Sequence, residues 1–303
     1  MDISIFIQIL VWGLYAGCIY ILLAIGLNLI FGVMKVVNFA HGELLMIGAY
    51  VTFWLYSSSG INPYLVVPIS TFIMAILGIL IERFGFRPIR GTGKLNEIFL
   101  SLGLIYLLQN SAALLWTTNS RTIHSPYSDI LVPLGTIKLP LDYIIIIIAT
   151  ILFLIAFQLF MKKTTIGRAM RATSQNREAA ALMGINVERI DMLSFALGSA
   201  LAAVAGSLWL ISGQMVNPYV GSLPAIKAFA VIIIGGLGSI PGAIIAGLIL
   251  GIAENVVPVI IQSLVAVFNV EMSFTAWKDT IAFLILIIVL ILRPTGLFGK
   301  KGE

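Results

Sequence analysis

Long apolar runs, separated by short polar segments, make up most of the chain. They lie near residues 7–31, 40–56, 64–85, 97–117, 142–161, 191–212, 225–234, 243–266 and 278–292. Most approach the roughly 20 residues that a helix needs to cross the hydrocarbon core of a bilayer. The run 143–160 lacks the alternation of a barrel strand, so a helix is the remaining way to satisfy its backbone in lipid. The pattern predicts an all-α, polytopic transmembrane helical bundle of eight or nine spans. The count depends on the run 225–234, which is short and predicts a broken or re-entrant helix.

The composition excludes a soluble fold. Of 303 residues, 60% are hydrophobic and only 10% are charged, whereas soluble domains have about 25% charged residues. Water would not tolerate so much apolar surface, but lipid solvates it. We therefore expect a single transmembrane domain over residues 1–303. The first apolar run is too long for the core of a signal peptide and has no basic segment before it, so we expect it to be retained as a span.

Basic residues are concentrated in three polar regions, at 83–94, 162–189 and 293–301, whereas the segment 118–141 holds only Arg121 and Lys138. By the positive-inside rule, the three basic regions face the cytoplasm. Counting spans between them places the N-terminus outside and the C-terminus in the cytoplasm. The net charge of +5 therefore points to the lipid bilayer and not to nucleic acid, and no aromatic residues interleave with the basic ones to stack on bases.

Two small-residue breaks lie between apolar helices, near 32–43 and near 235–242. Corresponding interrupted helices in the two halves of a transporter point to its binding region. Glycine is also common in ordinary membrane helices, so the internal repeat stays open at this point. We treat both breaks as candidate parts of a translocation path.

Several polar residues fall at membrane depth, where ionisable groups are costly and usually face a cavity or a partner. For His41 and Glu43, the alternatives are lining a path or making a structural hydrogen bond at a helix break. For Glu254, they are lining a path or forming a packed pair, for which Lys227 is available. The candidate path residues are Asn38, His41, Gly42, Glu43, Gly235, Gly236, Gly238, Pro241, Gly242, Glu254 and Asn255.

The cytoplasmic segment 162–190 is long for a loop and has helix start and stop signals. Ser174 is expected to cap a short helix that ends at Gly184, where a left-handed residue terminates a helix most easily. Asn186 is expected to cap the next helix, with Glu188 in its first turn. A short helix rooted directly in a span can transmit movement from a cytoplasmic partner. Its alternative is an interfacial helix that rests on lipid head groups.

The residues Glu178-Ala179-Ala180, followed by Gly184, resemble the EAA-type coupling motif of permease subunits in ATP-binding-cassette importers. Other stretches resemble the signatures of the branched-chain amino acid permease family, most closely its LivH type. They lie at 26–32, 38–44 and 48–50 in the first half, at 235–243 in the second half, and at 293–299 near the C-terminus. Urea and short-chain amide permeases are similar families.

The resemblance implies a subunit of an importer in the bacterial inner membrane. Its expected partners are cytoplasmic ATPase subunits, a second related permease subunit and an extracytoplasmic binding protein that delivers substrate. Glu178, Ala179, Ala180 and Gly184 would couple the chain to the ATPase. No cofactor is expected in this chain, because Gly93-Lys94 lacks the earlier glycine and the following Ser or Thr of a phosphate-binding loop. ATP would be used by the partners.

Two other classes of membrane protein share some of these features. An ion-coupled secondary transporter also has broken helices and buried charges, but it needs no ATPase-docking motif. An intramembrane enzyme needs several ligands or a nucleophile and base at one depth, and the chain has only His41 and His124. We therefore expect no catalytic and no metal-binding residue.

Overall fold

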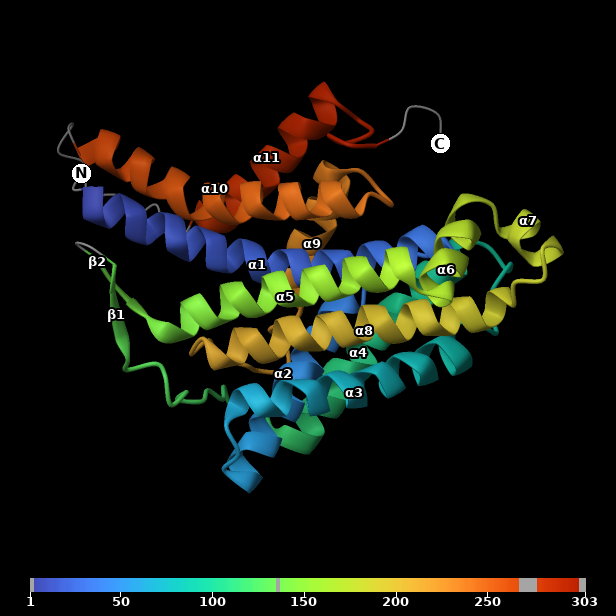
Figure 1. The fold of residues 1–303 in the computed structure, drawn as a ribbon, viewed down its shortest axis with the longest axis horizontal. Helices are drawn as coiled ribbons and strands as arrows, with labels where there is room; N and C mark the ends of the chain where they lie inside the picture. The colour runs from blue at the N-terminus through green and yellow to red at the C-terminus, as the bar shows by residue number, and fades with distance from the viewer. Residues whose placement is uncertain (1–2, 135–136, 267–276, 300–303) are drawn as a thin grey trace.

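The computed structural model describes residues 3–134, 137–266 and 277–299. The chain folds into a bundle of helices that run along its longest dimension (Figure 1). The helices are α1 (Ile3–Met34), α2 (His41–Ser59), α3 (Pro63–Ile81), α4 (Lys94–Trp116), α5 (Leu141–Lys163), α6 (Thr165–Gln175), α7 (Arg177–Leu182), α8 (Val187–Ile211), α9 (Ser222–Gly235), α10 (Ile240–Ala266) and α11 (Lys278–Leu292). A π-helical turn, η1 (Glu82–Phe86), extends α3. A short antiparallel hairpin, β1 (Leu131–Leu134) with β2 (Ile137–Pro140), precedes α5.

The predicted all-α membrane bundle is confirmed, and each of the nine apolar runs forms a helix. The predicted count of eight or nine spans is not confirmed. Within the described residues, six helices are long and apolar enough to cross a membrane, namely α1, α3 with η1, α4, α5, α8 and α10. Among the others, α2 carries His41 and Glu43 in its first turn, and α9 and α11 have only 14 and 15 residues.

The core is built around α1 and α8, which are buried on nearly all sides, whereas α4 and α5 are mostly exposed. Helices that are apolar all round belong in such a central position. Glycines allow the two central helices to touch. A Cβ atom on Gly26 would lie 2.7 Å from the carbonyl oxygen of Gly198, and one on Gly198 would lie 2.8 Å from that of Gly26. The outer helices expose rows of leucine and isoleucine, as is expected of surfaces that face lipid.

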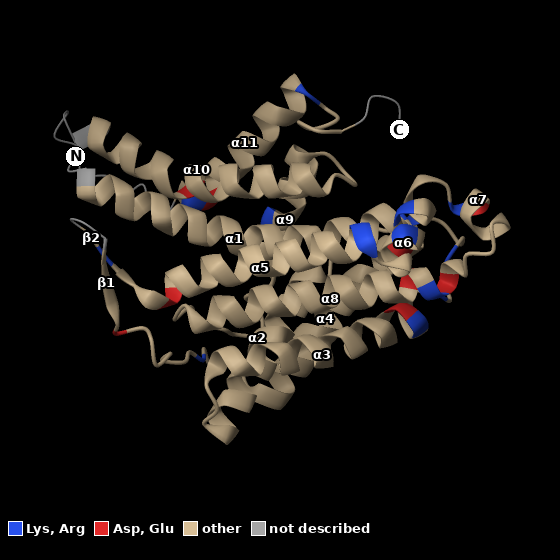
Figure 2. Ribbon diagram, viewed as in Figure 1, with Lys and Arg blue, Asp and Glu red and all other residues tan. Residues whose placement is uncertain are grey.

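The charged residues gather at the end of the bundle that holds α6 and α7 (Figure 2). Arg87 and Arg90, from the basic region at 83–94, contact Glu188 and Asp191, which follow α7. Two of the three basic regions therefore lie on the same side of the bundle. The hairpin and the N-terminus lie at the opposite end (Figure 1). There the backbones of Arg121 and Val216 form an isolated antiparallel β-bridge.

Two segments without helix turn back into the bundle from opposite ends. The chain leaves α1 at Met34, and residues 35–40 bring it back to the middle of that helix, because His41 Nε2 lies 3.2 Å from the carbonyl oxygen of Leu23. Leu23 is 34 − 23 = 11 residues before the end of α1, about 16 Å along the helix. Likewise, α8 ends at Ile211, and residues 212–221 return to this depth, where α9 begins.

The two halves of the chain are consequently arranged as an inverted repeat, in which α1–α2–α3 corresponds to α8–α9–α10. The segment that matches 35–40 is 212–221, whereas the sequence pattern pairs 35–40 with the glycines near 235–242. Residues 236–239 form a tight turn between α9 and α10, next to the α6 end of α1, since the Gly238 amide donates to Asn28 Oδ1 at 2.7 Å.

Candidate functional site: the α2–α9 junction and the α6–α7 segment

The N-terminal ends of α2 and α9 meet deep in the bundle. A Cβ atom on Gly42 would lie 2.1 Å from the carbonyl oxygen of Gly221, and one on Gly221 would lie 2.4 Å from that of Gly42. Only glycine at both positions allows the backbones to be this close. From this junction α2 runs toward the hairpin, where Tyr56 donates to the carbonyl oxygen of His124, and α9 runs toward the α6 end. The junction therefore joins two helix termini with positive dipole ends.

Four of the predicted path residues lie at this junction. Asn38 Oδ1 accepts from the Ala40 amide at 3.1 Å and so shapes the turn into α2. The His41 ring is fully buried, and its Nδ1 has no hydrogen-bond partner among the described residues. The side chain of Glu43 is buried as well, and its Oε1 accepts from Gln109 Nε2 of α4 at 2.9 Å.

Gln109 also bridges the two halves. Its Nε2 lies 3.2 Å from the hydroxyl of Ser222, the first residue of α9. The second carboxylate oxygen of Glu43 is buried without a hydrogen-bond partner among the described residues. The junction thus has unpaired polar atoms beside two helix termini, a setting suited to a zwitterionic ligand. Nothing in the sequence marked Gln109 as a residue of the site, apart from its being a polar residue within an apolar run.

The predicted path residues from 235 to 242 lie elsewhere, at the α6 end. Gly235 and Gly242 bring α9 and α10 together, since a Cβ atom on Gly242 would lie 2.0 Å from the carbonyl oxygen of Gly235. Gly236 (φ +96°) and Gly238 (φ +82°) form the turn between them. The C-terminal residues pack on it, because the amides of Leu297 and Phe298 donate to the carbonyl oxygens of Ile234 and Gly235. The stretches 235–243 and 293–299 therefore form one packed unit.

A cavity of about 380 Å³ opens beside this turn. Pro241 and Gly238 line it, together with Asn28, Lys35 and Arg171. Lys35 has a left-handed backbone (φ +60°) and ends α1, since its amide donates to the carbonyl oxygen of Phe31. The structure thus separates the two sequence-predicted breaks: one is deep in the bundle, and the other borders a cavity at the α6 end.

Glu254 and Asn255 belong to a third place, a buried polar cluster between α9, α10 and α11. Glu254 forms an ion pair with Lys227, so the structure has the packed pair that the sequence left open. Lys227 Nζ also lies 2.7 Å from Asp279 Oδ1 and donates to the Tyr20 hydroxyl at 3.1 Å. Asn255 Oδ1 accepts from Lys278 at 3.0 Å. These contacts join α11 to α9 and α10.

The segment α6–α7 projects from the end of the bundle that carries most of the charges (Figures 1 and 2). The predicted cap at Ser174 is wrong, because α6 continues to Gln175 and the Ser174 hydroxyl donates to the carbonyl oxygen of Arg171. Asn176 caps α7 instead, accepting from the Ala179 amide at 2.9 Å. The extended backbone of Asn176 (φ −151°) separates the two helices.

The other two predicted signals in this segment are confirmed. Gly184 has φ +80° and ends α7, while the Ile185 amide donates to the carbonyl oxygen of Ala180, a pattern typical of a Schellman stop. Asn186 caps α8 by accepting from the Arg189 amide at 3.0 Å. The chain therefore passes from a short helix directly into a central helix of the bundle.

The tip of α7 presents apolar side chains outward. Leu182 is 88% exposed and Met183 is 83% exposed, whereas Ala180 is buried against the bundle. Of the predicted coupling residues, Glu178, Ala179 and Gly184 are exposed. Exposed apolar side chains rimmed by polar ones occur at surfaces that contact another protein or a membrane.

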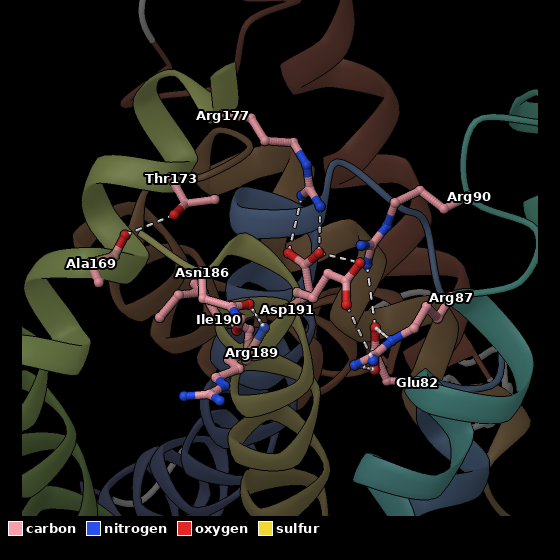
Figure 3. Close-up of polar contacts among 12 residues, drawn as sticks. Glu82, Arg87, Arg90, Ala169, Thr173, Arg177, Asn186, Arg189, Ile190 and Asp191 are labelled. Atoms are coloured by element: carbon pink, nitrogen blue, oxygen red, sulfur yellow. Dashed lines mark hydrogen bonds and ion pairs between the residues drawn. The ribbon is translucent and has the colours of Figure 1, made fainter. Parts of the chain in front are cut away.

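Behind α7 lies a network of ion pairs that the sequence did not reveal. Glu82 of η1 and Asp191 of α8 are both fully buried, and arginines from three places pair with them (Figure 3). The hydrogen bond to Glu82 raises the pKa of Arg87 above its ordinary value. The two carboxylates are 191 − 82 = 109 residues apart. In the sequence, the only indication of this network was that each of the two carboxylates lies at the end of an apolar run.

Comparison with known proteins decides the family. A family model described as "Branched-chain amino acid transport system / permease component" matches residues 9–290. The chain belongs to this permease family. The resemblance stated from the sequence motifs is thereby confirmed.

Two relatives of this permease match it along nearly their whole length, and a third matches it in part. The high-affinity branched-chain amino acid transport system permease protein BraD of Pseudomonas aeruginosa is 35% identical over 97% of this chain and 96% of its own length. The LivH permease protein of Escherichia coli, named for the same transport, is also 35% identical, over 97% of this chain and 96% of its own length. The LivM permease protein of Escherichia coli is 27% identical over 78% of this chain and 61% of its own length.

The fold of the permease is similar to that of a solved structure. "PsaBC from Streptococcus pneumoniae in complex with Fab" matches with a TM-score of 0.53 and 15% sequence identity, covering 98% of both chains. At this identity the match shows a shared fold alone. The similar proteins found by sequence are transport permease components and not enzymes.

Proposed function

We propose that this permease forms the membrane path for branched-chain amino acids in an ATP-driven importer. The observation that carries the proposal is the near full-length similarity to BraD and LivH, which are named for this transport. The "Probable branched-chain amino acid transport permease protein LivH" of Methanocaldococcus jannaschii is 32% identical over 92% of this chain and 88% of its own length. Leucine, isoleucine and valine are the proposed substrates.

The substrate passes the α2–α9 junction on its way through the bundle. Two helix N-termini face each other there, and their positive ends suit the carboxylate of an amino acid. The close contact of Gly42 with Gly221 means that the two helices must separate for a substrate to pass. The cavity beside Gly238 and Pro241 is the proposed exit, since it lies at the α6 end.

The partners are proposed from the surfaces and the family. Cytoplasmic ATPase subunits dock on the exposed tip of α7, formed by Glu178, Ala179, Leu182, Met183 and Gly184. The ATPases bind and use the ATP, and this chain needs no cofactor of its own. Similarity to LivM supports a second, related permease subunit, and an extracytoplasmic binding protein delivers the substrate at the hairpin end.

We further propose nine crossings of the bacterial inner membrane. The six long helices and α11 cross as helices, while α2 and α9 cross together with the irregular segments 35–40 and 212–221. An odd number of crossings places the termini on opposite sides, with the N-terminus outside and the C-terminus in the cytoplasm. The concentration of basic residues at the α6–α7 end supports this orientation.

The test is the uptake of radiolabelled leucine at low external concentration, with urea in parallel, in cells that lack only this chain. We expect leucine uptake to be lost and to be restored by the intact chain. Loss of urea uptake alone would move the substrate to the urea and short-chain amide class. Uptake that persists after ATP depletion but collapses with the ion gradient would instead support a secondary transporter.

A further inference from the structure

Two buried carboxylates connect α7 to the ends of α3 and α8. Asp191 accepts two hydrogen bonds from Arg177, with Nη1 to Oδ1 at 3.0 Å and Nη2 to Oδ2 at 2.5 Å. Arg90 reaches the same Oδ2 at 2.5 Å and also pairs with Glu82 Oε1 at 3.3 Å. Arg87 completes the set, pairing with Glu82 at 2.9 Å. Figure 3 shows the three guanidinium groups converging on the two carboxylates.

The network joins three parts of the chain: residues 82–90, the start of α7 and the start of α8. Arg177 is the first residue of α7, Asp191 lies in the first turns of α8, and Glu82 begins the π-helical turn η1. Arg90 belongs to the loop between η1 and α4. Single π-helical turns are rare and occur often at functional sites. The network therefore fastens the docking helix to two helices of the bundle.

Burial of the carboxylates strengthens this connection between the helices. The side chains of Glu82 and Asp191 are 0% exposed, while those of the arginines are about one third exposed or less. A buried carboxylate that loses its partner is strongly unfavourable. If α7 moved away from α8, Asp191 would lose its two hydrogen bonds from Arg177 and keep only Arg90, so movement of the two helices as one unit is favoured over their separation.

Close packing continues from this unit to the α2–α9 junction. A Cβ atom on Gly78 of α3 would lie 2.3 Å from the Ser199 hydroxyl of α8, so the two helices are in direct contact. In the same way, a Cβ atom on Gly48 of α2 would lie 2.6 Å from the Cα atom of Ala203 of α8. Displacement of α8 therefore acts directly on α2.

We propose that Arg177, Asp191, Arg90 and Glu82 form a clamp that joins α7, α8 and α3 into one mechanical unit, so that movement of a docked ATPase reaches the α2–α9 junction. The proposal rests on the proposed function, because it requires a partner that moves α7. These four are positioning residues: they act through the helices that they join and contact no substrate.

The experiment uses the complete importer, with this chain, its related permease and the ATPase subunits, in proteoliposomes. ATP hydrolysis and leucine uptake driven by the binding protein are measured in the same vesicles. Arg177→Gln removes the link between α7 and α8. The matched control is Arg189→Gln, because Arg189 is exposed, makes no ion pair within the described part of the chain, and points away from Asp191 (Figure 3).

We expect Arg177→Gln to keep the ATPase bound in co-purification and to raise the ATP used per leucine by about tenfold, which corresponds to about 1.4 kcal/mol and lies within the range typical of coupling between sites. Arg189→Gln should keep the wild-type ratio. An unchanged ratio for Arg177→Gln, or uptake and hydrolysis that fall in parallel, would overturn the clamp.

A second variant separates coupling from stability. Arg177→Gln combined with Asp191→Asn removes the buried charge that Arg177→Gln leaves with Arg90 alone, and it also removes the clamp. We expect this double variant to remain uncoupled even where its stability recovers. Return of the wild-type ratio would show that the network only stabilises the fold, and the clamp would be refuted. If the wild-type importer takes up no leucine, the proposed function fails, whatever the variants do.

Discussion

Replacing Gly42 with alanine tests whether the α2–α9 junction is as tight as the structure has it. The added methyl carbon would lie 2.1 Å from the carbonyl oxygen of Gly221 and 2.6 Å from the Cβ atom of Ala225. Ordinary contacts between these atoms are about 3.4 Å or longer, so α2 and α9 would have to move apart by about 1 Å. Forcing one extra methyl group into a packed core costs about 1–3 kcal/mol.

Gly103→Ala is the matched control. Gly103 lies on the exposed face of α4, and nothing stands within 4 Å of an added Cβ atom. Both variants exchange glycine for alanine in a helix, so the gain in helix propensity, up to about 1 kcal/mol, affects both. We therefore expect Gly42→Ala to be less stable than Gly103→Ala by about 1–3 kcal/mol.

The assay is thermal unfolding of the purified permease in detergent, followed by leucine uptake at equal membrane protein levels. Gly42→Ala should melt at a lower temperature than Gly103→Ala and should take up leucine more slowly per molecule. Equal melting temperatures would refute the close contact at the junction. A lower melting temperature with unchanged uptake per molecule would leave the contact but remove the junction from the path.

Three further outcomes are expected. Gly184→Val places a β-branched residue at φ +80°, at a cost of about 1–2 kcal/mol or more. This variant should uncouple transport from ATP hydrolysis, and uptake by vesicles equal to wild type would contradict this. Leu182→Glu should reduce co-purification of the ATPase. Met215→Glu should not, because the Met215 side chain is also exposed but lies at the opposite end of the bundle. Equal retention of the ATPase by both variants would show that α7 is not the docking site. Lys227→Met should destabilise the permease by about 3–5 kcal/mol because it leaves Glu254 buried without its lysine. The double variant with Glu254→Gln should recover much of the lost stability, as measured by thermal unfolding. No recovery would show that loss of the ion pair is not the cause.

Much of the fold was predictable because composition is decisive in lipid. Each apolar run became a helix, since a bilayer gives the backbone few other ways to satisfy its hydrogen bonds. The local signals around α7 were also readable. Gly184 has the left-handed backbone that ends a helix, and Asn186 accepts the hydrogen bond of a cap.

The misplaced cap shows the limit of such local signals. Ser174 and Asn176 are both residues that cap helices, and only two positions separate them. The choice depends on where the backbone leaves the helical conformation, which it does at Asn176. Serine inside a helix can instead donate to a carbonyl oxygen of the preceding turn, as Ser174 does.

The contacts between distant segments were not predictable. Residues 212–221 read as an ordinary loop, because nothing in their composition shows that they return to the middle of the bundle. The ion pair between Arg90 and Asp191 joins positions 191 − 90 = 101 residues apart. Lys227 and Glu254 were easier to pair, because two opposite charges in neighbouring apolar runs have few other partners.

The inverted arrangement of α2 and α9 has a consequence for how the two ends of the bundle open. The helices start at one point, where Gly42 meets Gly221, and leave it in opposite directions. A tilt of α2 about this pivot widens the half of the bundle that ends at the hairpin, and the matching tilt of α9 widens the half that ends at α6. The two tilts therefore act on opposite halves of the bundle, and the contact of Gly42 with Gly221 keeps the two halves apart until the helices separate.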